Sequence, residues 1–221
     1  MWARWQVLQI ADSAFPTGGF AHSGGLEAAM QHGRARTAEG LDAYVREHLW
    51  NVGWASLPFL TAAFDAPGDV WALDAWADAT IISHVANRAS RTQGRTFLAT
   101  CAQIFDEPPV LAMASRARTR EVSAHLAPVF GASLAALGAA RHEAQALHLY
   151  VALRGVASAA VRLGVVGPHE AQRLQRRHSR TLDAVLAACE NVAPDDAATA
   201  FPLLDLMGAT HDRLYARLFQ S

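Results

Sequence analysis

The segment from Ala144 to Leu163 is apolar on almost every side of the helix that it is expected to form. Its length approaches the roughly twenty apolar residues that a membrane-spanning helix needs. However, Arg154 and Arg162 lie inside the segment, and each would cost about 2.5–3.5 kcal/mol near the centre of a bilayer. His148 adds another polar group. We therefore predict a central helix that is surrounded by the other helices of a bundle, not a membrane span.

The rest of the chain also shows helical patterns, because alanine is abundant and alternating runs of β-branched residues are missing. We expect a loop over 191–199 and see no linker long enough to divide domains. The expected helices are 41–52 after a cap at Thr37, 73–81 after Asp69, 90–105 closed by Pro108-Pro109, 126–137, one that begins at Pro168 and carries Leu174, His178, Leu182, Val185, Leu186 and Cys189 on one stripe, and 203–216. The chain is thus predicted to be all-α, a single-domain helical bundle over residues 1–221.

Composition leaves open how the apolar residues are used. Hydrophobic residues make up 52% of the 221 residues and charged residues 18%, a charged share below the usual quarter. Either the core is unusually well filled or some apolar surface is reserved for partners. The first five residues lack the charged flank and long apolar run of a signal peptide, so we expect a cytoplasmic protein.

The charge pattern argues against nucleic-acid binding. The net charge is −1, and arginine is spread along a chain that contains no lysine. The densest basic group, Arg173, Arg176, Arg177 and Arg180, is best explained as the solvated face of a helix. The two cysteines, Cys101 and Cys189, lie far apart in helical segments and are expected to be lone buried thiols.

No bound metal or other cofactor is predicted. The pair His142-Glu143 begins like a zinc-protease motif, but that motif needs a second histidine four residues after the first, where this chain has Ala146. The ten histidines are scattered, without a tract and without Cys/His pairs at ligand spacing. We interpret the pairs His169-Glu170 and His211-Asp212 as exposed polar residues.

No catalytic residue is predicted either. Gly18-Gly19 and Gly24-Gly25 bracket a short loop, but a phosphate-binding P-loop needs a lysine, and a dinucleotide fingerprint needs a preceding strand. A Ser/His/Asp or Cys/His set cannot be assembled, because spatial neighbours are not visible in a sequence.

Two end segments are less ordinary. The loop at 12–27 carries Phe15 and Phe20 between turn-forming residues, and these rings either plug the core or lie exposed for a partner. The tail at 213–221 combines tyrosine, arginine, leucine and phenylalanine, the mixture that is enriched at binding hot spots. Docking of the tail onto its own domain is the alternative.

These segments resemble the UreF family of urease accessory proteins. The residues that carry the resemblance are Phe15-Pro16-Thr17-Gly18-Gly19-Phe20-Ala21-His22-Ser23-Gly24-Gly25-Leu26-Glu27, the preceding 8–12, the central 158–164 with Gly167 and Gln172, then His211 and the ending 217–221. They occur in the family's order and span nearly the whole chain. Two departures stand out: the region 87–94 lacks the acidic residues that many bacterial members carry, and His22 replaces an aromatic residue of some members.

The resemblance implies a nickel-delivery adaptor and not an enzyme. Such a protein dimerises, binds the accessory protein UreD (UreH in some organisms), recruits the GTPase UreG and helps to deliver nickel to apo-urease. On this basis we assign partner binding to Phe20, His22 and Arg217, with Tyr215, Leu218 and Phe219 in support. Two alternatives remain: activation of UreG by an arginine such as Arg217 acting in trans, and a metal-dependent helical enzyme built from the scattered histidines and aspartates.

Overall fold

The computed structural model describes the backbone of residues 3–221 and the side chains from residue 5 onward. Within these residues all the regular structure is helical, and none of them forms a strand. The all-α prediction is therefore confirmed. The first two residues of the amino-terminal segment used to exclude a signal peptide lie outside the described residues. The α-helices are α1 (Ala3–Ala11), α2 (Leu26–Gln31), α3 (Ala38–Ala55), α4 (Leu57–Asp65), α5 (Val70–Thr80), α6 (His84–Ile104), α7 (Pro108–Arg118), α8 (Leu126–Ala136), α9 (Arg141–Arg162), α10 (Pro168–Arg177), α11 (Ser179–Cys189) and α12 (Pro202–Ala209).

Short 3₁₀ helices join several of these elements: η1 (Gly19–Ala21), η2 (Pro67–Asp69), η3 (Pro194–Asp196) and η4 (His211–Arg213). The expected loop over 191–199 thus contains η3. No helix among the described residues is both long and apolar enough to cross a membrane.

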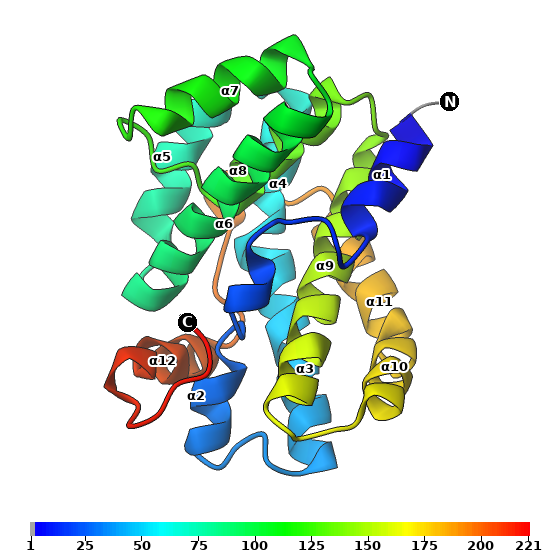
Figure 1. Ribbon diagram of the computed structural model, residues 1–221, viewed down its shortest axis with the longest axis vertical. Helices are drawn as coiled ribbons and strands as arrows, with labels where there is room; N and C mark the ends of the chain where they lie inside the picture. The colour runs from blue at the N-terminus through cyan, green and yellow to red at the C-terminus, as the bar shows by residue number, and fades with distance from the viewer. Residues whose placement is uncertain (1–2) are drawn as a thin grey trace.

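The predicted central helix is α9, which runs through the middle of the molecule in Figure 1. It packs against α1, α2, α3, α4, α8, α10 and α11. The charged heads within this apolar segment reach backbone carbonyls near the amino terminus: Arg154 donates to the carbonyl oxygen of Ala11, and Arg162 to that of Phe20. These two arginines, which argued against a membrane span, therefore tie the amino-terminal segment to the central helix.

The tightest helix crossings rely on glycine. Helix α8 is buried along Ala127–Leu134 and packs against α4, α5 and α6. A Cβ atom on Gly131 would lie 2.1 Å from the carbonyl oxygen of Leu60, so only glycine lets α8 approach α4 this closely. Gly94 does the same where α6 meets the backbone of Ala124, with a distance of 2.0 Å.

The structure corrects several predicted boundaries. Helix α6 begins six residues earlier than expected, because the Ser83 hydroxyl caps it by accepting from the backbone N–H of Ala86 at 3.3 Å. Pro108-Pro109 was expected to close a helix but instead opens α7, since proline also suits a first helical turn. The long helix predicted from Pro168 is divided at His178 into α10 and α11. By contrast, the predicted cap at Thr37 is confirmed, with its hydroxyl accepting from Gly40 N–H at 3.1 Å.

The last predicted helix is shorter than expected, and this matters for the site. Helix α12 ends at Ala209, and the chain then turns through η4 into an extended tail that lies against the amino-terminal loop (Figure 1). Cys101 and Cys189 are buried and form no disulfide, as predicted, and burial raises the pKa of the Cys101 thiol to about 12.

Candidate protein-binding surface

The two end segments singled out in the sequence lie side by side. The backbone N–H of Gln220 donates to the carbonyl oxygen of Ala21 at 2.9 Å, and that of Ser23 donates to the carbonyl oxygen of Ser221 at 2.6 Å. The Ser23 hydroxyl donates to the same Ser221 oxygen at 3.0 Å. The tail is thus docked on its own domain, which was one of the two alternatives left open by the sequence.

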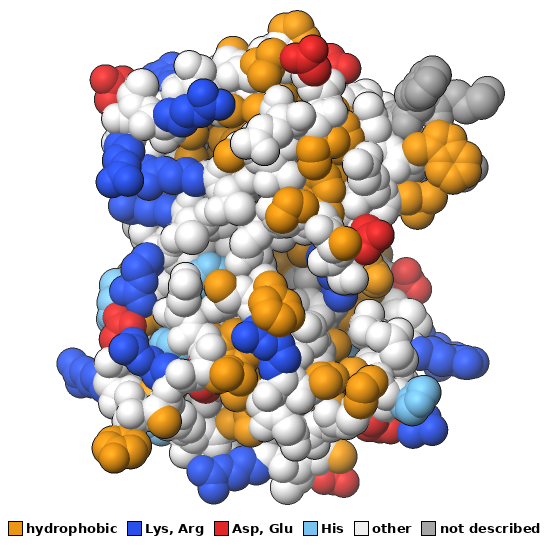
Figure 2. Space-filling model, in the orientation of Figure 1, with side chains coloured by type: hydrophobic (Ala, Val, Ile, Leu, Met, Phe, Trp, Pro, Cys, Tyr) orange, Lys and Arg blue, Asp and Glu red, His pale blue; other side chains and the backbone are white. Residues whose placement is uncertain are grey.

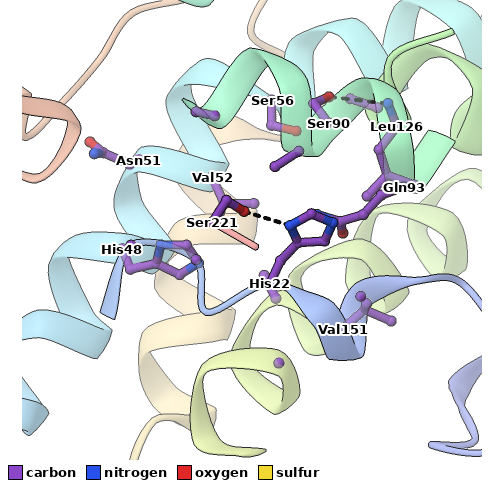
Figure 3. Close-up of a pocket in the computed structure, with 18 of the residues that line it drawn as sticks. His22, His48, Asn51, Val52, Ser56, Ser90, Gln93, Leu126, Val151 and Ser221 are labelled. Carbon is purple, nitrogen blue, oxygen red and sulfur yellow. Dashed lines mark hydrogen bonds between the residues drawn. The ribbon is translucent and has the colours of Figure 1, made fainter. Parts of the chain in front are cut away.

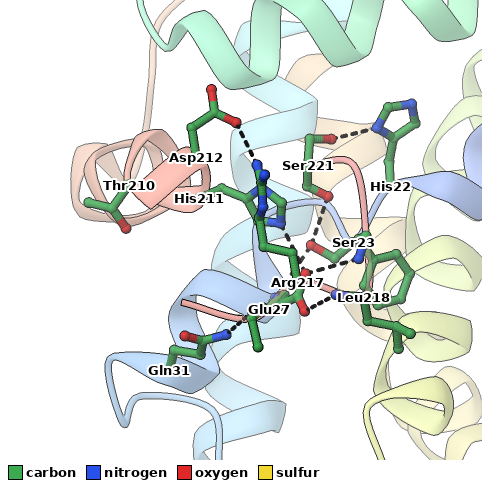
Figure 4. Close-up of polar contacts among 12 residues, drawn as sticks. His22, Ser23, Glu27, Gln31, Thr210, His211, Asp212, Arg217, Leu218 and Ser221 are labelled. Atoms are coloured by element: carbon green, nitrogen blue, oxygen red, sulfur yellow. Dashed lines mark hydrogen bonds and ion pairs between the residues drawn. The ribbon is translucent and has the colours of Figure 1, made fainter. Parts of the chain in front are cut away.

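Glu27 binds the tail through hydrogen bonds to its backbone. Its carboxylate is buried and accepts hydrogen bonds from the backbone N–H groups of Leu218 at 2.6 Å and Phe219 at 3.1 Å. It also lies 3.0 Å from Nε2 of His211, which is fully buried (Figure 4). The prediction that His211 is an exposed polar residue is therefore wrong, although its neighbour Asp212 is exposed. All three partners of Glu27 come from the carboxyl-terminal segment, so this one carboxylate fixes where the tail lies.

Arg162 joins the loop and the tail at their apolar side chains. Its guanidinium carbon lies 3.8 Å from the centre of the Phe20 ring and 4.2 Å from the centre of the Phe219 ring. A guanidinium beside an aromatic ring gains cation–π attraction of about 0.5–1 kcal/mol at an exposed site and about 2 kcal/mol when it is shielded from water. Because Arg162 sits at the end of α9, it anchors both end segments to the central helix.

His22 completes the contact between loop and tail. Its ring is buried, and Nδ1 lies 2.5 Å from the Ser221 hydroxyl. Burial lowers the pKa of His22, and the nearby Arg88 and His211 lower it further. The ring is therefore neutral near pH 7. Its other nitrogen, Nε2, is buried without a hydrogen-bond partner.

Within residues 3–221, no cluster of three or more His, Cys, Asp or Glu side chains is arranged to hold a metal ion. The scattered histidines instead make separate contacts, such as that of His148 with the Ser56 hydroxyl at 2.8 Å.

Comparison with known proteins decides the family. A UreF family model matches residues 35–179. Urease accessory protein F of Arabidopsis thaliana is 38% identical over 224 residues, which cover 100% of this chain and 92% of the relative. Urease accessory protein F of Oryza sativa subsp. indica is 34% identical, with 99% and 84% covered, and urease accessory protein UreF of Mycobacterium tuberculosis (strain ATCC 25177 / H37Ra) is 30% identical, with 97% of each covered. The chain belongs to the UreF family. The resemblance stated from the sequence is therefore confirmed, and this is a member of a urease accessory protein family.

The residues predicted to bind partners divide into exposed and buried ones in this UreF-family chain. The Phe20 side chain is 71% exposed, Leu218 is 53% exposed and Tyr215 is fully exposed. His22 and Phe219 are buried beneath them. Arg217 is partly exposed, with its guanidinium 3.4 Å from the Asp212 carboxylate. Partner binding by these residues stays a prediction. Only the exposed side chains among them can contact a partner directly while the tail stays docked.

We call the group formed by Phe20, Tyr215, Arg217 and Leu218 the end-segment surface. Figure 2 shows separate hydrophobic side chains on one face of the molecule, some of them near its middle and beside a basic side chain. Sequence reasoning missed Glu27, Arg162 and His211 as the residues that hold this surface in place. The sequence did contain a signal for Glu27, because a carboxylate that follows two glycines and a leucine in an apolar helix needs hydrogen-bond donors when it is buried. Those donors could not be identified from the sequence, since they come from the tail, almost two hundred residues away.

Proposed function

We propose that this UreF-family chain is a non-catalytic adaptor in urease maturation. It binds a UreD-type protein (UreH in some organisms), and the complex recruits the GTPase UreG for delivery of nickel to apo-urease. Family membership supports the role in urease maturation.

The observation that carries the proposal is the end-segment surface. Three apolar side chains, Phe20, Tyr215 and Leu218, are at least half exposed. The tail backbone is nevertheless held in place, because Glu27 accepts from the backbone N–H of Leu218 and Ser23 donates to the carbonyl oxygen of Ser221. Exposed aromatic and aliphatic side chains on an ordered backbone are typical of binding hot spots. Because the backbone is already ordered, a partner that covers this surface loses less conformational entropy than one that must first order a disordered tail.

The proposal also includes the expected homodimer. We expect the end-segment surface to bind the UreD-type protein and not the second copy. This assignment requires the dimer contact to lie elsewhere on the chain.

Reconstitution tests the order of assembly. We expect this chain to co-purify with its UreD-type partner, and to capture UreG only when that partner is present. Urease matured in cells that lack this chain should contain little nickel, and the wild-type chain should restore it. Urease with a normal nickel content in such cells would refute the adaptor role.

Activation of UreG through Arg217 is the less favoured alternative. The Arg217 guanidinium lies against Asp212, which is also paired with Arg88 at 2.8 Å, so Arg217 already has a partner on this chain. An arginine finger typically raises GTP turnover by about 10³–10⁵-fold. We expect UreG in the assembled complex to show a change of only a few-fold, and the same change with Arg217→Ala.

A further inference from the structure

A cavity of about 520 Å³ lies behind the end-segment surface (Figure 3). Its walls come from the amino-terminal loop, α3, the connection between α5 and α6, the first half of α6, the start of α8, and helices α9 and α12. Pockets that accept ligands in proteins usually measure about 300–1,000 Å³ and have mostly apolar walls with a few polar groups. This cavity fits that description and has no role in the fold described above.

The cavity is continuous with the end-segment surface. Phe20, which belongs to that surface, lies on the lining, and so does Ile82, whose side chain is 82% exposed. The buried tail residues Phe219 and Ser221 line it as well. A partner that covers the end-segment surface therefore also covers the mouth of the cavity.

One buried polar atom in the cavity lacks a partner. His22 lies on the lining with 8% of its surface exposed, and Nδ1 contacts Ser221 while Nε2 has no hydrogen bond (Figure 3). A buried polar group without a partner costs about 1–3 kcal/mol. A ligand group that forms a hydrogen bond with Nε2 would remove this cost.

The other polar groups of the lining favour an uncharged ligand. Burial lowers the pKa of His48 and of His148 to about 4, so both rings are neutral near pH 7. Burial raises the pKa of Asp205, which lines the cavity near α12. Two arginines of the lining, Arg154 and Arg162, already donate to the carbonyl oxygens of Ala11 and Phe20. A charged ligand would lose its hydration here, and an anion would have to compete with these bonds for a guanidinium partner.

We propose that the cavity receives a tyrosine or tryptophan side chain that the UreD-type partner inserts through the end-segment surface, with its hydroxyl or indole N–H bonded to His22 Nε2. The inference rests on the proposed function. Tyrosine and tryptophan combine a large apolar body with one polar group, which is the combination that this lining accepts. They are also the residues most enriched at the centres of protein interfaces.

Gly155 offers a way to fill the cavity without disturbing the fold. It lines the cavity one helical turn after Val151, and a Cβ atom added to it meets nothing within 4 Å. Gly155→Phe should therefore occupy the space that the partner's ring would take. Gly155→Ala is the matched control, because it leaves most of the space open. Val151→Trp fills the cavity from the neighbouring turn and checks the result independently.

The isolated chain is tested first, with p-cresol and indole as probes for the two side chains. We expect both probes to shift the NMR signals of the His22 ring in a saturable way, and the shift to vanish in Gly155→Phe. Gly155→Ala should keep it. Absence of any shift in the wild-type chain would overturn the inference without reference to a partner.

Affinity for the UreD-type protein is measured next. We expect Gly155→Phe and Val151→Trp, both folded by circular dichroism, to bind at least tenfold more weakly than wild type, and Gly155→Ala to bind within twofold of it. Equal binding by wild type and the filled variants would refute the cavity's role while leaving the adaptor function intact. If the wild-type chain itself binds no UreD-type protein, the proposed function fails, and this assignment of the occupant fails with it.

Discussion

Glu27 shows how a single buried charge determines the position of a distant segment. Its carboxylate receives two backbone N–H groups and one imidazole nitrogen, all from residues 211–219. Removing the carboxylate leaves these buried donors without an acceptor. Because breaking a buried ionic hydrogen-bond set costs about 3–5 kcal/mol, we expect Glu27→Ala to lower the free energy of unfolding by about 3 kcal/mol.

Urea denaturation measures this effect. The control is Glu39→Ala, which removes an exposed carboxylate from the first turn of α3 and should cost no more than about 0.5 kcal/mol. Similar losses for the two variants would contradict the structural role assigned to Glu27.

Two histidines, the half-buried His48 and the buried His148, make stability depend on pH. The pKa values of His48 and His148 are lowered by burial to about 4, whereas an unfolded histidine titrates near 6.5. Between these values the unfolded chain binds more protons than the folded chain, so stability falls as pH decreases from 6.5 towards 4. Each histidine contributes a slope of up to about 1.4 kcal/mol per pH unit in this range.

His148→Leu should flatten this slope. Denaturation at several pH values between 4.5 and 7.5 measures it, and His142→Leu, at an exposed position of the same helix, should leave the slope unchanged. A pH dependence that is identical in wild type and His148→Leu would show that His148 is not buried as a neutral ring.

At the scale of elements, two helical glycines should respond in opposite ways to the same substitution. Gly131→Ala places a methyl group against the backbone of Leu60 and must push α8 away from α4, so we expect a loss of at least about 2 kcal/mol. Gly155→Ala enters open space and should stabilise α9 by about 0.5–1 kcal/mol through helix propensity. Thermal unfolding distinguishes the two, and destabilisation of equal size at both sites would contradict the packing described.

The sequence predicted elements well where local chemistry decides them. The Thr37 cap and the start of α10 at Pro168 follow from short-range rules, and both are observed. Pro108 is compatible with the end of one helix and the start of another, so the sequence could not settle which. The burial of His211 and the end of α12 at Ala209 depend on contacts with Glu27 and the amino-terminal loop, which no local pattern reveals.

The candidate site was predictable in its segments but not in its geometry. The sequence identified Phe20 and the tail as special, yet exposure separates Phe20 and Leu218 from the buried Phe219 only in three dimensions. Phe15 and Phe20 looked alike in the loop, but Phe15 stacks on Phe105 in the core, at 6.0 Å between ring centres, while Phe20 faces solvent.

For the whole molecule, the docked tail should act as part of the fold. Deletion of residues 214–221 removes two of the three partners of Glu27, the Ser221 carbonyl that accepts from Ser23, and the Phe219 ring beside Arg162. We expect the truncated chain to stay helical, because α4, α8 and α9 do not depend on the tail, but to melt about 10 °C lower, as a loss of about 3 kcal/mol implies for a chain of this size. A melting temperature within 2 °C of wild type would show that the tail is only loosely attached.

The end-segment surface is tested most directly by the affinity of the isolated chain for its UreD-type protein, measured by isothermal titration calorimetry. We expect the triple variant Phe20→Ala, Tyr215→Ala, Leu218→Ala to bind at least a hundredfold more weakly than wild type. A control that removes exposed apolar side chains elsewhere, Trp76→Ala, Ile104→Ala, Leu111→Ala, should bind within threefold of wild type. Wild-type affinity in the triple variant, or an equal loss in the control, would contradict the account.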